Sequence, residues 1–128
     1  MEKYNKKVMD HFLNPRNMGK MQNPTVTGEA GNAVCGDVLF LYLKIEKNEE
    51  GKDIIKDVKF ETFGCAAAIA TSSALTEIIK GKTIDEAQRV SNKDVEEYLG
   101  QLPLIKKHCS NLAEDALKDA LKKLKDKK

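Results

Sequence analysis

The stretch KHCSNLAEDAL, from Lys107 to Leu117, sets a histidine beside a cysteine at the start of an amphipathic helix. Apolar residues recur along it at the three-and-four spacing of one helix face. They are Leu112, Ala113, Ala116, Leu117, Ala120, Leu121 and Leu124. Cys109 therefore belongs in or just before the first turn, where unpaired N–H groups and the helix dipole favour a thiolate. A thiolate binds metals or attacks sulfur, and the ring of His108 can bind a metal or hold a proton.

Two runs upstream of this stretch alternate apolar and polar residues, as antiparallel strands do when one face is buried. In the first, Val38 to Lys47, the apolar row consists of Leu39, Leu41, Leu43 and Ile45. In the second, Ile54 to Phe63, Val58 and Phe60 can meet that row across a short turn. The sequence therefore predicts an antiparallel pair. Ahead of it, the Gly-, Asn- and Pro-rich segment from Gly19 to Gly36 is expected to be mobile or an edge strand.

A short helix is predicted before the Asn14-Pro15 pair, which should stop it. Tyr4, Val8 and Phe12 share one side of this helix, and His11 is a candidate for the same side. Such a pattern is typical of a helix that docks on the rest of the domain. We assign His11 a packing role and no metal.

Three further helices are expected between the strands and the His108-Cys109 turn. They are Ala66 to Ile79, a short helix from a Thr83/Glu86 capping box to Val90, and a helix from Ser91 or Asn92 to just before Gly100. The small residues of the first favour close packing on the sheet. Pro103 then keeps the link from Leu102 to Ile105 extended.

Length and charge indicate one domain over residues 1–128 and argue against two classes of partner. The net charge is +2 and aromatic residues make up 5% of the chain, so no broad basic field with stacking side chains suggests nucleic-acid binding. The basic cluster Lys122 to Lys128 is interpreted as solvating a helix end. No apolar run has membrane length, and the start MEKYNKKVMDHF lacks a signal-peptide core. We therefore expect a cytoplasmic protein.

The three cysteines each lie at a boundary between predicted elements. Cys35 precedes a strand, Cys65 follows a strand and precedes a helix, and Cys109 starts a helix. An odd count fits poorly with a disulfide framework, and boundaries of this kind tend to converge at one end of a small domain. Three unrelated buried thiols are the alternative. Glycines beside two of them, Asp37 near the first and His108 beside the third favour a shared metal site.

Two kinds of metal suit such a ligand set. Zinc would be satisfied by three thiolates and either His108 or Asp37 in a closed tetrahedral site. A 2Fe-2S cluster usually takes four thiolates, so three leave one corner to Asp37, His108 or another molecule. A weaker corner favours release of a cluster. Asp37 also has a structural alternative, as a carboxylate at a strand start that accepts backbone hydrogen bonds.

Five ordered blocks resemble the iron-sulfur cluster assembly scaffold family, which comprises IscU and the N-terminal domain of NifU. The blocks are NPRNMG (Asn14 to Gly19), CGD (Cys35 to Asp37), GCAAAIATSS (Gly64 to Ser73), GKTIDEA (Gly81 to Ala87) and HCSNLAEDAL (His108 to Leu117). The resemblance covers nearly the whole chain. It implies an α+β fold, with a small antiparallel β-sheet covered by helices. The IscU type is preferred over the SufU type, which lacks a histidine before the last cysteine and carries an insertion between the first two.

The resemblance also implies a function. A 2Fe-2S cluster would be assembled on Cys35, Cys65 and Cys109, with Asp37 or His108 as the fourth ligand, and passed to apo iron-sulfur proteins. A cysteine desulfurase of the IscS/NifS type would deliver persulfide sulfur, with Cys109 as acceptor. Exchange at sulfur needs a thiolate, and the helix start favours a thiolate at Cys109. Iron and electrons would come from elsewhere, with frataxin or ferredoxin as candidate donors. The chain would act as a non-catalytic scaffold, with a homodimer or a small oligomer as the candidate assembly.

One departure and two alternatives accompany this reading. Residues Leu102 to Lys106 read LPLIK where many members carry LPPVK, the segment gripped by an Hsp70-type chaperone, so the missing proline weighs against that partner. The first alternative is a stable zinc-binding domain that modulates a cysteine desulfurase. The second, a Cys-His hydrolase or thiol oxidoreductase, ranks last because Cys109 and His108 are adjacent in the chain and no CxxC pair exists.

Overall fold

Three antiparallel strands form one sheet, in the order β1-β2-β3, in the computed structural model of the chain. The structure describes the backbone of residues 6–32, 37–63, 66–100 and 107–127, and the side chains of 6–31, 38–63, 68–100 and 112–127. The strands are β1 (Val26–Asn32), β2 (Asp37–Lys47) and β3 (Asp53–Phe63). The predicted strand pair is confirmed as β2 and β3. Of the two alternatives for the Gly-rich segment before it, the edge strand is the one that forms, as β1.

One face of the sheet carries the apolar row that the alternation predicts. Leu41 on β2 pairs with Gly28 on β1 and with Phe60 on β3, and Leu43 pairs with Val26 and Val58. The three leucines of this row on β2 and their partners Val58 and Phe60 on β3 are fully buried, and Ile45 is partly buried. Burial on this face is what holds the register, because a slip of one residue would turn the row to solvent.

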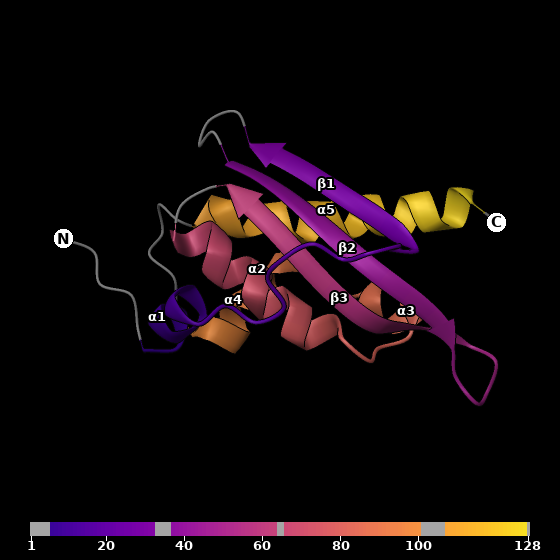
Figure 1. Cartoon of the computed structure of the whole chain (residues 1–128). Coiled ribbons are helices and arrows are strands. Elements are labelled where there is room, and N and C mark those ends of the chain that lie inside the picture. Colours follow the sequence, from indigo (N-terminus) through magenta and orange to yellow (C-terminus); the bar gives the residue numbers. More distant parts are fainter. Residues whose placement is uncertain (1–5, 33–36, 64–65, 101–106, 128) are drawn as a thin grey trace.

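The helices cover this face of the sheet, as Figure 1 shows. They are α1 (Lys6–Leu13), α2 (Ala66–Ile79), α3 (Ile84–Ala87), α4 (Asn92–Leu99) and α5 (Lys107–Asp126). Helix α5 lies along β1 and β2, α2 packs against both β3 and α5, and α1 and α4 pack on α2. The fold is therefore the predicted α+β arrangement, a small antiparallel sheet covered by helices. Among the described residues, no helix combines the length and apolar character needed to cross a membrane.

Most predicted helix ends are confirmed, and one is wrong. The capping box of Thr83 and Glu86 is present, but α3 ends at Ala87 and not at Val90. Past Ala87 the chain tightens, with the Val90 N–H donating to the Ala87 carbonyl three residues back at 3.1 Å. A bond over three residues belongs to a tighter turn than an α-helix has. The predicted extended link from Leu102 to Ile105 lies outside the described residues.

Candidate metal centre

The ends of several elements gather at one end of the molecule. Asn32, the last residue of β1, pairs with Asp37, the first of β2, and Val38 pairs with Phe63, the last of β3. Helix α2 begins three residues later, at Ala66. Figure 1 shows these ends, together with the start of α5, at the same side of the molecule. We call this the Asp37 end.

Contacts along β1 place the start of α5 at the Asp37 end as well. Asp119 Oδ2 accepts a hydrogen bond from the Glu29 N–H at 2.8 Å, and Lys127 Nζ donates to the Thr25 carbonyl at 2.7 Å, so the helix and β1 run in opposite directions. The three steps along the strand from Glu29 to Asn32 span about 10 Å, which a helix covers in about seven residues. The level of Asn32 therefore falls near residue 112. The first turn of α5 lies just past the end of β1.

The five predicted site residues are placed by the structure to different degrees. Asp37 opens β2, and His108 and Cys109 are the second and third residues of α5, so Cys109 lies in the first helical turn as its periodicity predicts. Only the backbone of these three is described. Cys35 and Cys65 lie outside the described residues. No group of three or more metal-binding side chains is found among the side chains that the structure does describe. The shared metal site stays a prediction.

A threonine that sequence reasoning missed ties β3 to β2 at this end. Thr62 is buried, and its Oγ1 donates to the Val38 carbonyl at 2.6 Å. This bond joins the end of β3 to Val38, the residue that follows Asp37. Phe63, next along, is 70% exposed. The bond holds together the strand ends that lead to Asp37 and toward Cys65.

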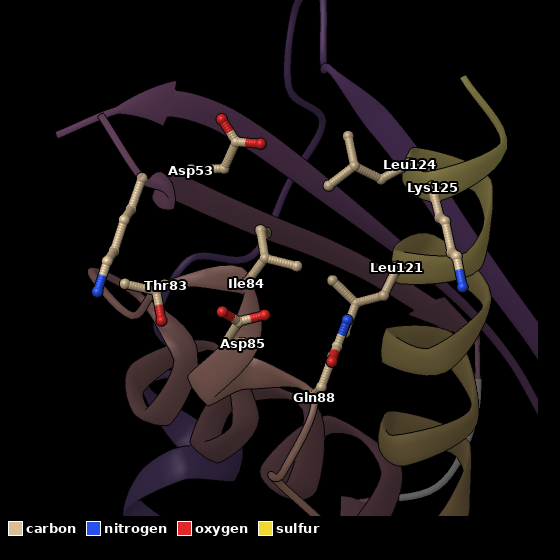
Figure 2. Close-up of a pocket in the computed structure, with 9 residues that line it drawn as sticks. Asp53, Thr83, Ile84, Asp85, Gln88, Leu121, Leu124 and Lys125 are labelled. Atoms are coloured by element: carbon tan, nitrogen blue, oxygen red, sulfur yellow. The ribbon is translucent and has the colours of Figure 1, made fainter. Parts of the chain in front are cut away.

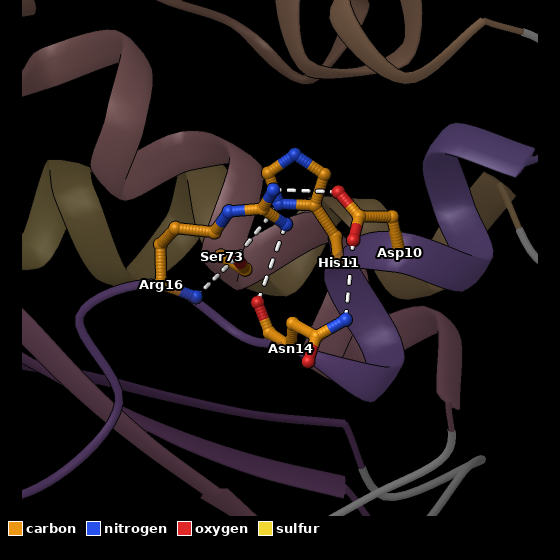
Figure 3. A network of polar contacts seen from close by, with 5 residues as sticks. All are labelled: Asp10, His11, Asn14, Arg16 and Ser73. Carbon is orange, nitrogen blue, oxygen red and sulfur yellow. Dashed lines mark hydrogen bonds and ion pairs between the residues drawn. The ribbon is translucent and has the colours of Figure 1, made fainter.

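The NPRNMG block docks α1 on α2 through a polar network, shown in Figure 3. His11 is buried, with its Nδ1 2.7 Å from Ser73 Oγ and its ring edge-on to Tyr98. The Arg16 N–H donates to the same Ser73 Oγ at 2.9 Å, which leaves the hydroxyl proton free for Nδ1 of a neutral ring. Burial lowers the pKa of His11, and the positive charge of Arg16 lowers it further. The packing role expected for His11 is what the structure shows, and the Ser73 partner was missed.

The same block closes the outer edge of β3. The Asn17 carbonyl accepts from the Phe60 N–H at 2.9 Å, and the Gly19 N–H donates to the Phe60 carbonyl at 2.8 Å. Asn17 reaches this geometry with a positive φ of 62°, which asparagine adopts more readily than most residues. Its side-chain amide also donates to Thr76 Oγ1 on α2 at 3.0 Å. The block therefore joins α1, α2 and β3, whose far end is the Asp37 end.

A cavity of about 360 Å³ lies elsewhere, between the β2-β3 hairpin, α3 and the C-terminal part of α5. In Figure 2 the carboxylates of Asp53 and Asp85 flank Ile84, and Leu121 and Leu124 form the opposite wall. The part of α5 that lines it, from Leu121 to Lys125, lies at the opposite end of the helix from His108 and Cys109.

A small antiparallel sheet covered on one face by helices, with its element ends gathered beside Asp37, defines an α+β domain. The family model described as "NifU-like N terminal domain" matches residues 3–128. The chain belongs to this family.

Individual relatives show which members of the family the chain resembles. The chain is 54% identical over 118 residues to "Iron-sulfur cluster assembly scaffold protein IscU 1" of Archaeoglobus fulgidus, covering 92% of this chain and 74% of that protein. It is 51% identical over 128 residues to "Iron-sulfur cluster assembly scaffold protein IscU" of Azotobacter vinelandii, covering 98% and 96%. A crystal structure of a putative scaffold protein for the SUF system from Fervidobacterium islandicum superposes with a TM-score of 0.74 at 26% identity, covering 92% and 96%. The preference for the IscU type is supported by the relatives' names, and the fold by the superposition.

Proposed function

We propose that this protein is a scaffold on which a 2Fe-2S cluster is assembled and from which it is passed to apo-proteins. Its family and the names of its IscU relatives support iron-sulfur cluster assembly. The observation that carries the proposal is the gathering of the ends of β1, β2, β3, α2 and α5 at the Asp37 end. Each cysteine is within three residues of one of those ends.

The proposed ligands are the thiolates of Cys35, Cys65 and Cys109, with Asp37 or His108 at the fourth corner. Soft thiolates are the ligands that iron-sulfur clusters take, and a carboxylate or imidazole corner is weaker than a fourth thiolate. A weaker corner suits a cluster that must leave. The iron and the sulfide are cargo in this reading, and so is the assembled cluster.

Sulfur would arrive as a persulfide on a cysteine desulfurase of the IscS/NifS type. The Cys109 thiolate would attack the outer sulfur of that persulfide, forming a new S–S bond while the desulfurase cysteine leaves as a thiolate. This exchange has no net oxidation. Reducing the transferred sulfur to sulfide then takes two electrons, which a one-electron donor such as ferredoxin would supply in two steps. Position in the first turn of α5 favours Cys109 as acceptor, because helix N-termini stabilise thiolates.

The proposal also covers the activity, the location and the partners of the chain. The chain would act as an acceptor and carrier and not as an enzyme, in the reducing cytoplasm, where three free thiols persist. Frataxin-type iron donors and apo iron-sulfur proteins are the expected partners, and homodimers or small oligomers are the expected assemblies. An Hsp70-type chaperone is the weakest candidate because LPLIK departs from LPPVK.

Zinc would compete for the same thiolates, so the experiment must separate a cluster from a resident zinc ion. The purified protein is stripped with a chelator and then reconstituted anaerobically with ferrous iron and sulfide. We expect visible absorption from a 2Fe-2S cluster at one cluster per site, and transfer of that cluster to an apo-ferredoxin. The matched controls are Cys35→Ser, Cys65→Ser and Cys109→Ser. A colourless protein that holds one zinc ion and resists chelation would support the zinc-binding alternative, which the relatives' names do not favour.

The sulfur step has its own measurement. Cys109→Ser should abolish uptake of persulfide from a cysteine desulfurase, recorded by mass spectrometry as loss of the added sulfur, whereas Cys35→Ser should retain it. Uptake by Cys109→Ser at the unmodified rate would assign the acceptor role to another thiol.

A further inference from the structure

The outer edge of β1 is the feature that this inference rests on. In β1, Thr27 and Glu29 alternate with the residues that bond to β2, so their backbone groups point away from the sheet. An edge strand with unpaired N–H and C=O groups invites pairing with another chain, and proteins usually block it. In this protein, helix α5 covers the outer edge of β1.

Side chains of α5 satisfy these edge groups directly. Asp119 Oδ2 accepts from the Glu29 N–H at 2.8 Å, and Lys123 Nζ donates to the Thr27 carbonyl at 3.3 Å. Lys123 and Asp119 also pair with each other at 2.9 Å, one helical turn apart. The pair lowers the pKa of Asp119 and raises that of Lys123, so both stay charged at neutral pH. We call Asp119 and Lys123 the edge clamp.

Packing and hydrogen bonds together set the position of α5 along β1. The contact is made by small residues, with Gly28 against Ala116 and Ala120 of the helix. Buried leucines of α5 add to this packing, and apolar burial is non-directional. Hydrogen bonds to charged side chains are directional and short-ranged, so they add a defined position along the helix axis to the contact made by packing.

We propose that the edge clamp is a positioning device for the cluster site: it sets how far α5 reaches past the end of β1. That distance places Cys109, at the start of α5, relative to the chain that leaves β1 toward Cys35. A slip of one helical residue would move Cys109 by about 1.5 Å and turn it by about 100°. The inference rests on the proposed function, because it assumes that Cys35 and Cys109 share a site.

The test measures how readily those two thiols are bridged. In a Cys65→Ser background, the only remaining thiols are Cys35 and Cys109. A bifunctional bimane reagent, which fluoresces after both arms have bonded to thiols, reports their bridging rate; a monofunctional thiol reagent corrects for changes in reactivity. Adding Asp119→Ala should lower the corrected rate about fivefold, which corresponds to about 1 kcal/mol. Asp119→Asn keeps a side-chain oxygen for the Glu29 N–H and should recover most of the rate.

Two further measurements separate positioning from stability. Asp115→Ala removes an exposed acid on the same helix and should leave the bridging rate unchanged. Lys123→Met keeps the apolar stem but loses the bond to Thr27, and should lower the rate about twofold; it serves as the second variant if Asp119→Ala does not fold. Hydrogen exchange at the Glu29 amide should become faster in Asp119→Ala, which confirms that the bond was present.

The outcomes are distinct. Faster exchange at Glu29 with an unchanged bridging rate would overturn the positioning role while leaving the scaffold proposal intact. An equal fall of the bridging rate in Asp115→Ala would also overturn the positioning role, because the loss of any acidic side chain on α5 would then lower the rate. If the Cys65→Ser background itself does not bridge, the shared site of the proposed function fails, and the inference fails with it.

Discussion

Gly28→Ala tests how closely α5 lies on β1. A Cβ at this position would lie 2.1 Å from the Ala116 carbonyl oxygen and 2.7 Å from Ala120 Cβ. Ordinary contact begins near 3.4 Å, so Ala116 would have to retreat by about 1.3 Å. The obstacle is helix backbone, which no side-chain rotation relieves. The whole of α5 must therefore move, or β1 must bend.

The size of the effect follows from that geometry. Overpacking a well-filled core costs about 1–3 kcal/mol, and a clash with backbone belongs at the upper end, about 3 kcal/mol. That is a large share of a total stability of about 5–15 kcal/mol. For a chain of this size it corresponds to a melting temperature lower by about 10 °C.

Urea unfolding followed by far-ultraviolet circular dichroism measures the change, with the slope checked to be constant. Thr27→Val is the matched control. The side chain of this neighbouring residue lies on the face of the sheet opposite to Gly28, and the substitution keeps its β-branched shape, so we expect a change within about 0.5 kcal/mol. A Gly28→Ala protein as stable as the control would mean that α5 does not lie this close to β1. The position inferred for the start of α5 would then lose its support.

Three other predictions concern single side chains. Because burial lowers the pKa of His11, the native state binds fewer protons than the unfolded chain just below the ordinary value of 6.5. Stability should therefore fall as the pH drops below about 6.5, and His11→Gln should flatten that dependence in urea titrations at pH 5–8. The hydrogen bond to Glu61 raises the pKa of Tyr42 to about 12, so Glu61→Gln should move one tyrosine midpoint in an ultraviolet titration back toward 10. Asp37→Ala should slow cluster transfer to an apo-ferredoxin because the oxygen corner is lost; unchanged kinetics would argue against that role for Asp37.

Periodicity was sufficient for most of the fold because the core pattern is regular. The leucine row of β2 and its partners Val58 and Phe60 could be matched before any coordinates, since alternation leaves one arrangement that buries both. Helix α2 was predicted with its observed bounds, from a run of small residues between Cys65 and Gly81. The error at Val90 arose because a capping box marks where a helix starts and says nothing of its length.

The polar contacts that position the site could not be predicted in the same way. Asp119 and Glu29 are 90 residues apart, and His11 and Ser73 are 62 apart, so neither pair leaves a local pattern. Lys123 and Lys127 were interpreted as solvating a helix end, whereas both bond to carbonyls of the segment around β1. A lysine near a helix C-terminus fits both roles, and only the strand beside it distinguishes them.

The polar contacts share a location that bears on how a scaffold can release its cargo. The edge clamp ties α5 to β1, the Thr62 bond ties β3 to β2, and the Asn14–Gly19 block ties α1 and α2 to β3. Together they fix every element that carries or adjoins a predicted ligand. These contacts are all made by groups other than the proposed ligands, whereas a zinc finger loses its fold with its metal. Contacts that do not pass through the cluster can persist when the cluster leaves, and a scaffold must release and rebuild its cluster in every cycle.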